Sequence, residues 1–133
     1  DKYNKYEDLY EMLSVSDAVF TCVHVASDTV GMVDSLFIDN MKDESYFINT
    51  SRGEIVVEQD LVNALESGKL RAAGVDVICN ENSESILDNV LIKYARKSDK
   101  LIITPHIAGL STDSESKAQL AAFNMIYDFV KNV

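Results

Sequence analysis

Short apolar segments alternate with segments of helical periodicity along this chain, and no other feature constrains the fold as strongly. Strands are expected at residues 18–25, 46–49, 72–77 and 101–104, and helices at 6–13, 34–41, 58–67, 86–96 and 112–131. Strands that alternate with helices form parallel sheets, because a parallel pair of strands needs a long crossover connection. Residues 18–25 are an almost unbroken apolar run, which is typical of a strand buried on both faces. The sequence therefore predicts an α/β fold.

Single residues mark the ends and inner faces of two of these helices. Asp34 is a candidate N-cap for the second helix, in which Leu36, Phe37 and Met41 would turn inward. Gly68 follows the third helix at the position where a left-handed residue commonly ends a helix. We therefore expect one helix to begin after Asp34 and the next to end at Gly68.

The glycines are informative because of a motif that they do not form. They stand at positions 31, 53, 68, 74 and 109, never at the G-x-G-x-x-G spacing that follows the first strand of a dinucleotide-binding fold. Four strands with crossover helices also make only half of a doubly wound sheet. Either the fold is a different one, or the chain lacks the front half of such a sheet.

Composition argues against several classes of partner. The 133 residues suit one domain or part of one, and 12 basic against 22 acidic side chains give a formal charge of −10. That charge argues against nucleic acid, because proteins that bind it present basic patches. No apolar run approaches the roughly 18 residues of a membrane span. The only cysteines, Cys22 and Cys79, favour a reduced, cytoplasmic protein in which both thiols are inert.

Four polar side chains follow predicted strands: Arg52, Asp76, Glu81 and His106. In an open parallel sheet the carboxyl ends of the strands line one crevice, and ligands bind there. A guanidinium, a carboxylate and an imidazole brought to one crevice are typical of a catalytic set. Each residue also has a plainer interpretation. Arg52 could form a surface ion pair, and His106 could be a buried structural histidine. Glu81 could be a solvated loop carboxylate, and Asp76 could cap the segment that follows it.

Four sequence blocks resemble the D-isomer-specific 2-hydroxyacid dehydrogenases. I-N-T-S-R-G at 48–53, L-E-S-G-K-L-R-A-A-G-V-D-V at 65–77 and T-P-H-I-A-G at 104–109 resemble signature motifs of that family. S-D-A-V at 16–19 with His24 resembles a further block. The blocks follow the family's order and spacing and span nearly the whole chain. The chain departs from the pattern at three places. The loop after His24 is shorter, Asn82 follows Glu81 where the family usually has proline, and Val57 stands where the family usually has an aspartate cap.

The resemblance implies a fold and a function. Residues 1–133 would be a partial dinucleotide-binding domain, the rear half of a Rossmann-like doubly wound parallel sheet without its glycine-rich loop. The helix at 112–131 would return toward a substrate domain that the chain lacks. The parent protein would be an oxidoreductase that transfers a hydride between NAD, or NADP, and a small D-2-hydroxy acid or 2-keto acid. The chain alone would be inactive. The alternative is a non-catalytic, dinucleotide-sensing protein that acts like a corepressor.

The resemblance also implies roles for individual residues, and no metal site. The catalytic residues would be Arg52, Glu81 and His106, and the cofactor-binding residues would be Thr50, Ser51, Arg52, Asp76, His106 and Gly109. Imidazole titrates near neutrality and suits a base that also returns the proton. Glu81 would hold the other ring nitrogen, and the guanidinium of Arg52 would bind the substrate carboxylate through two parallel hydrogen bonds.

The predicted first strand raises the question of association. If the front half of the sheet is missing, the strand at 18–25 has an unpaired edge, and an apolar edge strand tends to pair with another chain. We therefore expect the chain to self-associate, and the resemblance implies a homodimer for the parent protein.

Overall fold

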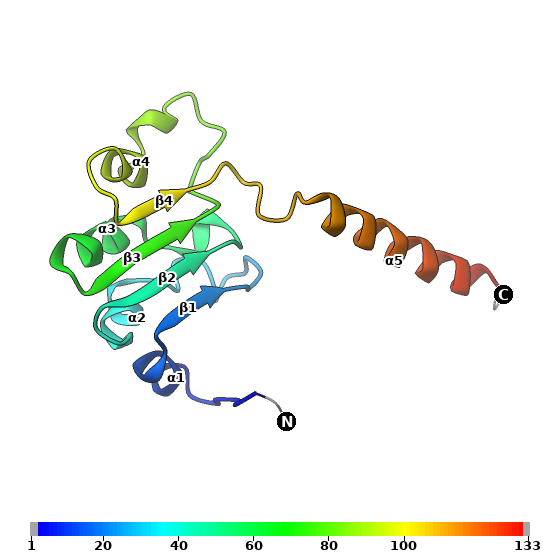
Figure 1. Ribbon diagram of the computed structural model, residues 1–133, viewed down its shortest axis with the longest axis horizontal. Helices are drawn as coiled ribbons and strands as arrows, with labels where there is room; N and C mark the ends of the chain where they lie inside the picture. The colour runs from blue at the N-terminus through cyan, green and yellow to red at the C-terminus, as the bar shows by residue number, and fades with distance from the viewer. Residues whose placement is uncertain (1–2, 132–133) are drawn as a thin grey trace.

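A parallel sheet of four strands is the scaffold of the structure (Figure 1). The computed structural model describes residues 3–131. The strands lie side by side in chain order, with β1 at Ala18–Thr21, β2 at Ser45–Asn49, β3 at Leu70–Val75 and β4 at Leu101–Ile103. Each neighbouring pair is parallel. The predicted α/β class with a parallel sheet is confirmed.

Helices lie between and after these strands. Within residues 3–131 they are α1 Leu9–Val15, α2 Ser35–Asn40, α3 Glu58–Ser67, α4 Val90–Ala95 and α5 Thr112–Lys131, with 3-10 helices η1 Gly53–Ile55 and η2 Ile86–Asp88. The helices predicted at 58–67 and 112–131 are confirmed. The helix predicted at 86–96 is split in two. Asn89 begins α4 there, because its side chain accepts hydrogen bonds from the N–H groups of Leu91 and Ile92.

The predicted helix ends are confirmed. The carboxylate of Asp34 accepts a hydrogen bond from the backbone N–H of Phe37 at 2.9 Å, so Asp34 caps α2. Phe37 and Met41 are buried, but Leu36 is 56% exposed. The inward orientation predicted for Leu36 is wrong, because a six-residue helix turns only one side toward the core. Gly68 ends α3 with φ of +83°, as expected for a left-handed residue.

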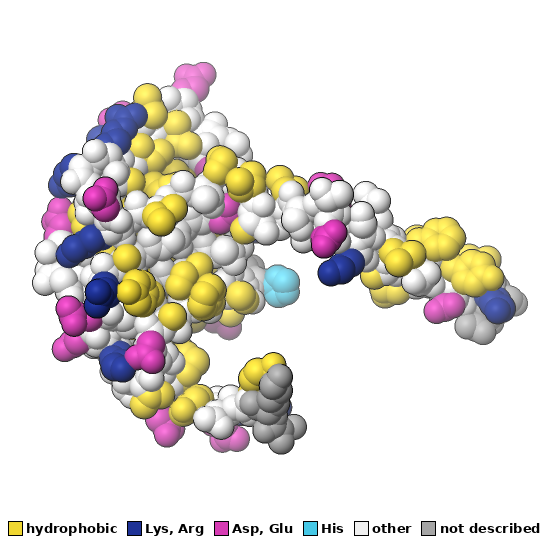
Figure 2. Space-filling model, viewed as in Figure 1, with side chains coloured by type: hydrophobic (Ala, Val, Ile, Leu, Met, Phe, Trp, Pro, Cys, Tyr) yellow, Lys and Arg dark blue, Asp and Glu magenta, His cyan; other side chains and the backbone are white. Residues whose placement is uncertain are grey.

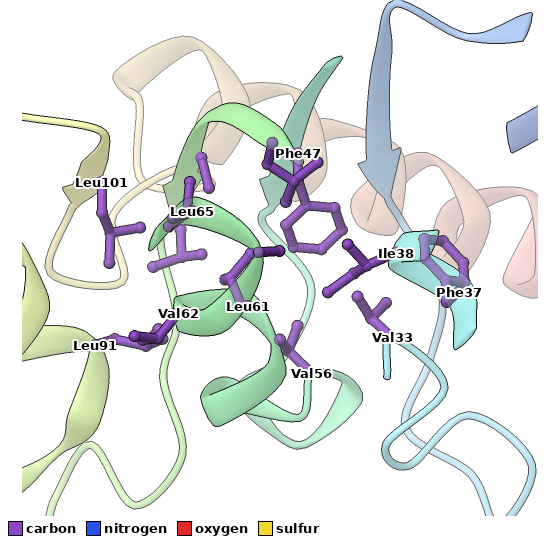
Figure 3. Packing of buried hydrophobic residues seen from close by; sticks show 14 of the residues in the cluster. Val33, Phe37, Ile38, Phe47, Val56, Leu61, Val62, Leu65, Leu91 and Leu101 are labelled. Atoms are coloured by element: carbon purple, nitrogen blue, oxygen red, sulfur yellow. The ribbon is translucent and has the colours of Figure 1, made fainter. Parts of the chain in front are cut away.

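The core lies between one face of the sheet and the helices α2, α3 and α4 (Figure 3). Phe47 of β2 and Leu61 and Leu65 of α3 are fully buried. Burying a side chain of this size stabilises the fold by about 1.5–3 kcal/mol each. This packing fixes helix α3 to the sheet, and with it the position of Glu58, the first residue of the helix.

The other face of the sheet is bare. Phe20 and Ile102 on this face are 63% and 66% exposed, and Tyr46 is 43% exposed. Figure 2 shows apolar side chains gathered on this side of the molecule. The strand predicted at 18–25 is shorter than expected and buries only Val19 and Thr21. The prediction that it is buried on both faces is wrong, because no helix of residues 3–131 packs on the second face.

Helix α5 extends away from the sheet (Figure 1). Each of its described side chains is exposed, including the apolar side chains of Leu120, Phe123, Ile126 and Tyr127. Among residues 3–131, no helix combines the length and the apolar character that a membrane span requires.

Candidate active site

The last residues of the four strands are aligned across the sheet, and the candidate site lies at this edge. In the sheet register Thr21 pairs with Asn49, Asn49 with Val75, and Val75 with Ile103. These are the last residues of the four strands. The segments that follow them therefore leave the sheet side by side along its carboxyl edge. Three of these segments carry predicted site residues.

The turn that carries Arg52 is held by a buried amide. The Oδ1 atom of Asn49 accepts hydrogen bonds from the Ser51 N–H and the Thr21 hydroxyl, both at 2.9 Å. Its Nδ2 atom donates to the carbonyl of Arg52 at 2.9 Å. The Ser51 hydroxyl donates to the carbonyl of Thr21 at 2.7 Å. Asn49 is fully buried, so the backbone of this turn is fixed while the Arg52 side chain remains exposed.

Gly53 brings the Arg52 turn against a second loop. A Cβ atom at Gly53 would lie 2.2 Å from the carbonyl carbon of Ile78 and 2.4 Å from the nitrogen of Cys79. No side chain fits at these distances, so the close backbone contact requires glycine. This contact therefore brings the Arg52 turn against the loop that continues to Glu81. Gly53 had no predicted role, although its place directly after Arg52 in the 48–53 motif was a signal.

The turn that carries His106 is held by Asp76. The Asp76 side chain, which is 5% exposed, accepts hydrogen bonds from the N–H of Ile107 at 2.9 Å and of Ala108 at 2.8 Å. It also accepts one from the hydroxyl of Thr104. The N–H of His106 donates to the carbonyl of Asp76 at 2.9 Å. His106 has a φ of +55°, a conformation uncommon for residues other than glycine. These hydrogen bonds hold it there.

Opposing effects act on the Asp76 carboxyl. Burial alone would raise its pKa, because it disfavours the charged form. The hydrogen bonds from Thr104, Ala108 and Ile107 outweigh burial, with a smaller contribution from the nearby His106 ring. The net result is a pKa below the usual aspartate value. Asp76 is therefore a carboxylate at neutral pH and holds the turn in charged form.

Glu81 and His106 form a direct pair. Nδ1 of His106 lies 2.6 Å from Oε1 of Glu81. A carboxylate only accepts hydrogen bonds, so this pairing requires the proton on Nδ1 and leaves Nε2 of the neutral ring with a free lone pair. The side chains are 46% and 32% exposed, which leaves the ring accessible. The ring is thus oriented to take up or release a proton at Nε2.

Arg52, Glu81 and His106 line one cleft. Its volume is about 500 Å³, and residues of the loop 77–83 complete its wall. The structure therefore brings together the three residues that the sequence analysis grouped as catalytic. Glu81 and His106 also line a neighbouring cavity of about 330 Å³, whose wall includes Ile78, Ile92 and other apolar side chains.

The remaining predicted site residues lie around this cleft. Thr50 and Ser51 line a cavity of about 510 Å³ together with Arg52 and the segment 22–25, which includes His24. Arg52 thus borders both spaces. Gly109 is exposed on the turn after His106, and a Cβ atom there would meet no other atom within 4 Å.

Both cysteines are free, and the pKa of one thiol is raised. Burial and the nearby carboxylates of Glu58 and Glu54 raise the pKa of the Cys79 thiol to about 11. The thiol is therefore protonated near neutrality, consistent with the predicted inert role. Cys22 is exposed. The part of the chain that the structure describes contains no cluster of His, Cys, Asp and Glu side chains able to hold a metal ion.

Comparison with known proteins gives one consistent family. A family model described as "D-isomer specific 2-hydroxyacid dehydrogenase, NAD binding domain" matches residues 1–108. The chain is similar to a hydroxypyruvate reductase of Blautia hydrogenotrophica, with 39% identity over 127 residues that cover 96% of the chain.

Two solved structures share the fold. A D-lactate dehydrogenase of Aquifex aeolicus, complexed with NAD and lactic acid, matches 96% of the chain with a TM-score of 0.75 and 30% identity. A D-isomer specific 2-hydroxyacid dehydrogenase of Lactobacillus delbrueckii ssp. bulgaricus, in its NAD-complexed form, matches 92% with a TM-score of 0.76 and 26% identity. The chain spans 38% of the length of the reductase and 41% and 40% of these two structures.

Proposed function

The chain belongs to the D-isomer specific 2-hydroxyacid dehydrogenase family, as part of its NAD-binding domain, and on that premise we propose the activity of the protein that contains it. That protein transfers a hydride between a nicotinamide cofactor and a small D-2-hydroxy acid or 2-keto acid. The observation that carries this proposal is the single cleft lined by Arg52, Glu81 and His106. We expect the 133 residues by themselves to be inactive, because their glycines form no glycine-rich phosphate loop.

His106 is the acid–base residue of this proposal. Its Nε2 takes the proton from the 2-hydroxyl group during oxidation and returns it to the keto oxygen during reduction. The pair with Glu81 at 2.6 Å keeps the ring in the required tautomer and stabilises the imidazolium form as it develops. Arg52 binds the substrate carboxylate with its planar guanidinium group and polarises the keto oxygen.

The residues of the chain suit the nicotinamide end of a dinucleotide. NAD, or NADP, supplies the hydride chemistry when it is bound. Thr50, Ser51 and Arg52 offer polar groups along one cavity, and the open space at Gly109 leaves room beside the His106 turn. The carboxylate of Asp76 accepts three hydrogen bonds from its own chain. A carboxylate has about four acceptor positions, so one remains for the carboxamide of the cofactor.

We further propose a cytoplasmic location and a homodimer for the parent protein. Free thiols at Cys22 and Cys79 are consistent with a reducing compartment. The bare sheet face and the exposed α5 offer apolar surface for a partner. The second candidate function is a dinucleotide-sensing, corepressor-like protein. An intact cleft is compatible with it, since a binding protein can retain catalytic side chains.

Steady-state kinetics of the full-length protein distinguishes the dehydrogenase from the dinucleotide-sensing protein. We expect NADH- or NADPH-dependent reduction of at least one small 2-keto acid in a panel that varies the side chain. Tight cofactor binding without turnover of any acid in the panel would favour the dinucleotide sensor.

The substitution Arg52→Lys tests the role of the guanidinium group. An ammonium group keeps the charge but cannot form two parallel hydrogen bonds with a carboxylate. We expect KM for the 2-keto acid to rise about tenfold or more, as for the loss of one charge-assisted hydrogen bond. Cofactor affinity should change by a smaller factor than KM, although Arg52 also borders the proposed cofactor cavity. Unchanged KM and kcat would remove Arg52 from the scheme.

A further inference from the structure

One carboxylate outside the proposed catalytic set contacts both ends of the loop that carries Glu81. Oε1 of Glu58 accepts a hydrogen bond from the N–H of Cys79 at 2.7 Å. Oε2 of Glu58 accepts one from Nδ2 of Asn89, also at 2.7 Å. Both bonds are partly buried. The loop between Cys79 and Asn89 is thus closed at its base by a single side chain.

This loop has few other polar connections to the fold. In the described chain, the remaining backbone hydrogen bonds of residues 80–88 close turns within the loop, or join the carbonyl of Ile86 to the N–H of Asn89. Ser83 and Ser85 bond to each other. Two side chains of the loop pair with residues outside it: Asp88 with Lys93 of α4, and Glu81 with His106. Glu58 therefore supplies the hydrogen bonds that connect the loop base to the core.

Glu58 is itself well anchored. It is the first residue of α3, whose side chains Leu61 and Leu65 are fully buried. The same carboxylate meets Asn89, which caps α4 through the N–H groups of Leu91 and Ile92. A displacement of about 1 Å in a catalytic group can lower a rate by roughly 10²-fold. The position of this loop therefore matters for a pair that lies 2.6 Å apart.

We propose that Glu58 is a positioning residue that, through Cys79 and Asn89, holds the loop so that Glu81 stays on Nδ1 of His106. Glu58 touches neither substrate nor cofactor in this scheme and acts through the loop alone. The catalytic consequence rests on the proposed function. The effect on the Glu81–His106 pair concerns only this chain and is measurable without turnover.

A polarity swap tests this role. Glu58→Gln replaces one acceptor oxygen by an NH₂ group. This group then faces either the Cys79 N–H or the Nδ2 group of Asn89, and because both of these are donors, one hydrogen bond is lost. Asn89→Asp places two carboxylates against each other. In the double variant the new amide donates to the new carboxylate, the Cys79 N–H keeps an acceptor, and aspartate remains a good N-cap. Glu66→Gln, at the exposed end of the same helix, is the matched control for loss of one charge.

The first readout is the NMR signal of the Nδ1–H proton of His106 in the 133-residue chain. His24, the other histidine of the chain, serves as the internal reference. We expect the signal to be lost or shifted in Glu58→Gln and in Asn89→Asp, restored in the double variant and unchanged in Glu66→Gln. A signal that stays unchanged in both single variants overturns the proposal. So does a double variant that restores nothing, whether or not the single variants fold.

The second readout is the kinetics of the full-length protein. We expect each single variant to lower kcat about 10- to 100-fold with little change in KM, and the double variant to recover to within about threefold. Equal loss in all three variants overturns the catalytic part of the inference. If the wild-type protein turns over no 2-keto acid while the NMR pattern holds, the proposed function fails and the positioning role of Glu58 stands.

Discussion

Asp76 shows how one side chain can shape a site without taking part in the chemistry. Its two oxygens accept hydrogen bonds from Thr104, Ile107 and Ala108. These bonds wrap the turn around the carboxylate and hold His106 in a left-handed conformation. The sequence left open whether Asp76 contacts a cofactor or caps the next segment. The cap on the next segment is wrong, because the Asp76 side chain accepts its hydrogen bonds from the turn after β4. The cofactor contact stays a proposal.

The pKa of Asp76 leads to a pH dependence of stability. The pKa in the folded state is lowered, so Asp76 contributes stability above its unfolded pKa of about 4. That contribution is lost as the pH falls through the folded pKa. We expect Asp76→Asn to be less stable than the wild type at pH 7, by about 1–3 kcal/mol for a lost acceptor, and the difference to shrink below about pH 4. Urea unfolding of both proteins at several pH values measures it. A difference that grows on acidification would contradict this assignment.

At the scale of elements, the site depends on two loops that touch through their backbones. Gly53 packs directly against the peptide between Ile78 and Cys79. Asn49 holds the first loop from below, and Glu58 holds the second. The side chains proposed to be catalytic come from distant parts of the sequence and are therefore placed by a small number of contacts between these loops and the core.

The substitution Gly53→Ala tests this contact. A methyl group 2.2 Å from the carbonyl carbon of Ile78 forces the two loops apart. We expect a loss of about 1–3 kcal/mol in the free energy of unfolding, as for an overpacked core, measured by urea denaturation. Turnover of the full-length protein should fall as well. Gly74→Ala is the control, because a Cβ atom there meets nothing within 4 Å. Equal stability of the two variants would mean that the contact is not tight.

Local patterns were sufficient to predict much of the fold. The parallel α/β class, the full length of α3 and α5, the Asp34 cap and the Gly68 end followed from periodicity and single residues. The grouping of Arg52, Glu81 and His106 followed from motif order and strand ends. Each of these features depends on neighbours in sequence or on a rule of sheet geometry.

Most of the features that were not predicted depend on distant contacts, and the split of the predicted helix at Asn89 is the exception. The split at Asn89 reflects a local cap that interrupts an apolar pattern continuing through it. The roles of Gly53 and Glu58 arise from contacts with residues more than 20 positions away. The bare face of the sheet could not be inferred from Phe20 or Ile102 alone, because an apolar residue does not reveal what covers it.

At the scale of the whole molecule, two apolar surfaces remain uncovered. On the bare sheet face, Phe20 aligns with Ile48, Gly74 and Ile102 across all four strands. Helix α5 exposes large apolar side chains in its second half, from Leu120 to Val130 (Figure 2). Contiguous apolar surface of this kind marks an interaction site in soluble proteins.

The isolated chain should therefore self-associate. We expect its average mass in light scattering to rise with concentration, because association buries the bare face and the β1 edge. The substitutions Phe20→Lys and Ile102→Lys, both at exposed positions, should shift the protein toward monomer. Val15→Lys, exposed on α1, is the control outside the sheet face. A monodisperse monomer at high concentration would contradict this prediction.

The most direct test of the account is to compare turnover with cofactor binding for His106→Ala in the full-length protein. General acid–base catalysis contributes about 10²- to 10⁴-fold in rate, and we expect kcat for 2-keto acid reduction to fall by that factor. The Kd of the reduced cofactor, measured by fluorescence titration, should change less than about threefold, because the Asp76 turn holds without the imidazole. Parallel losses in kcat and cofactor affinity, or an unchanged kcat, would show that His106 is not the proton-transferring residue of this cleft.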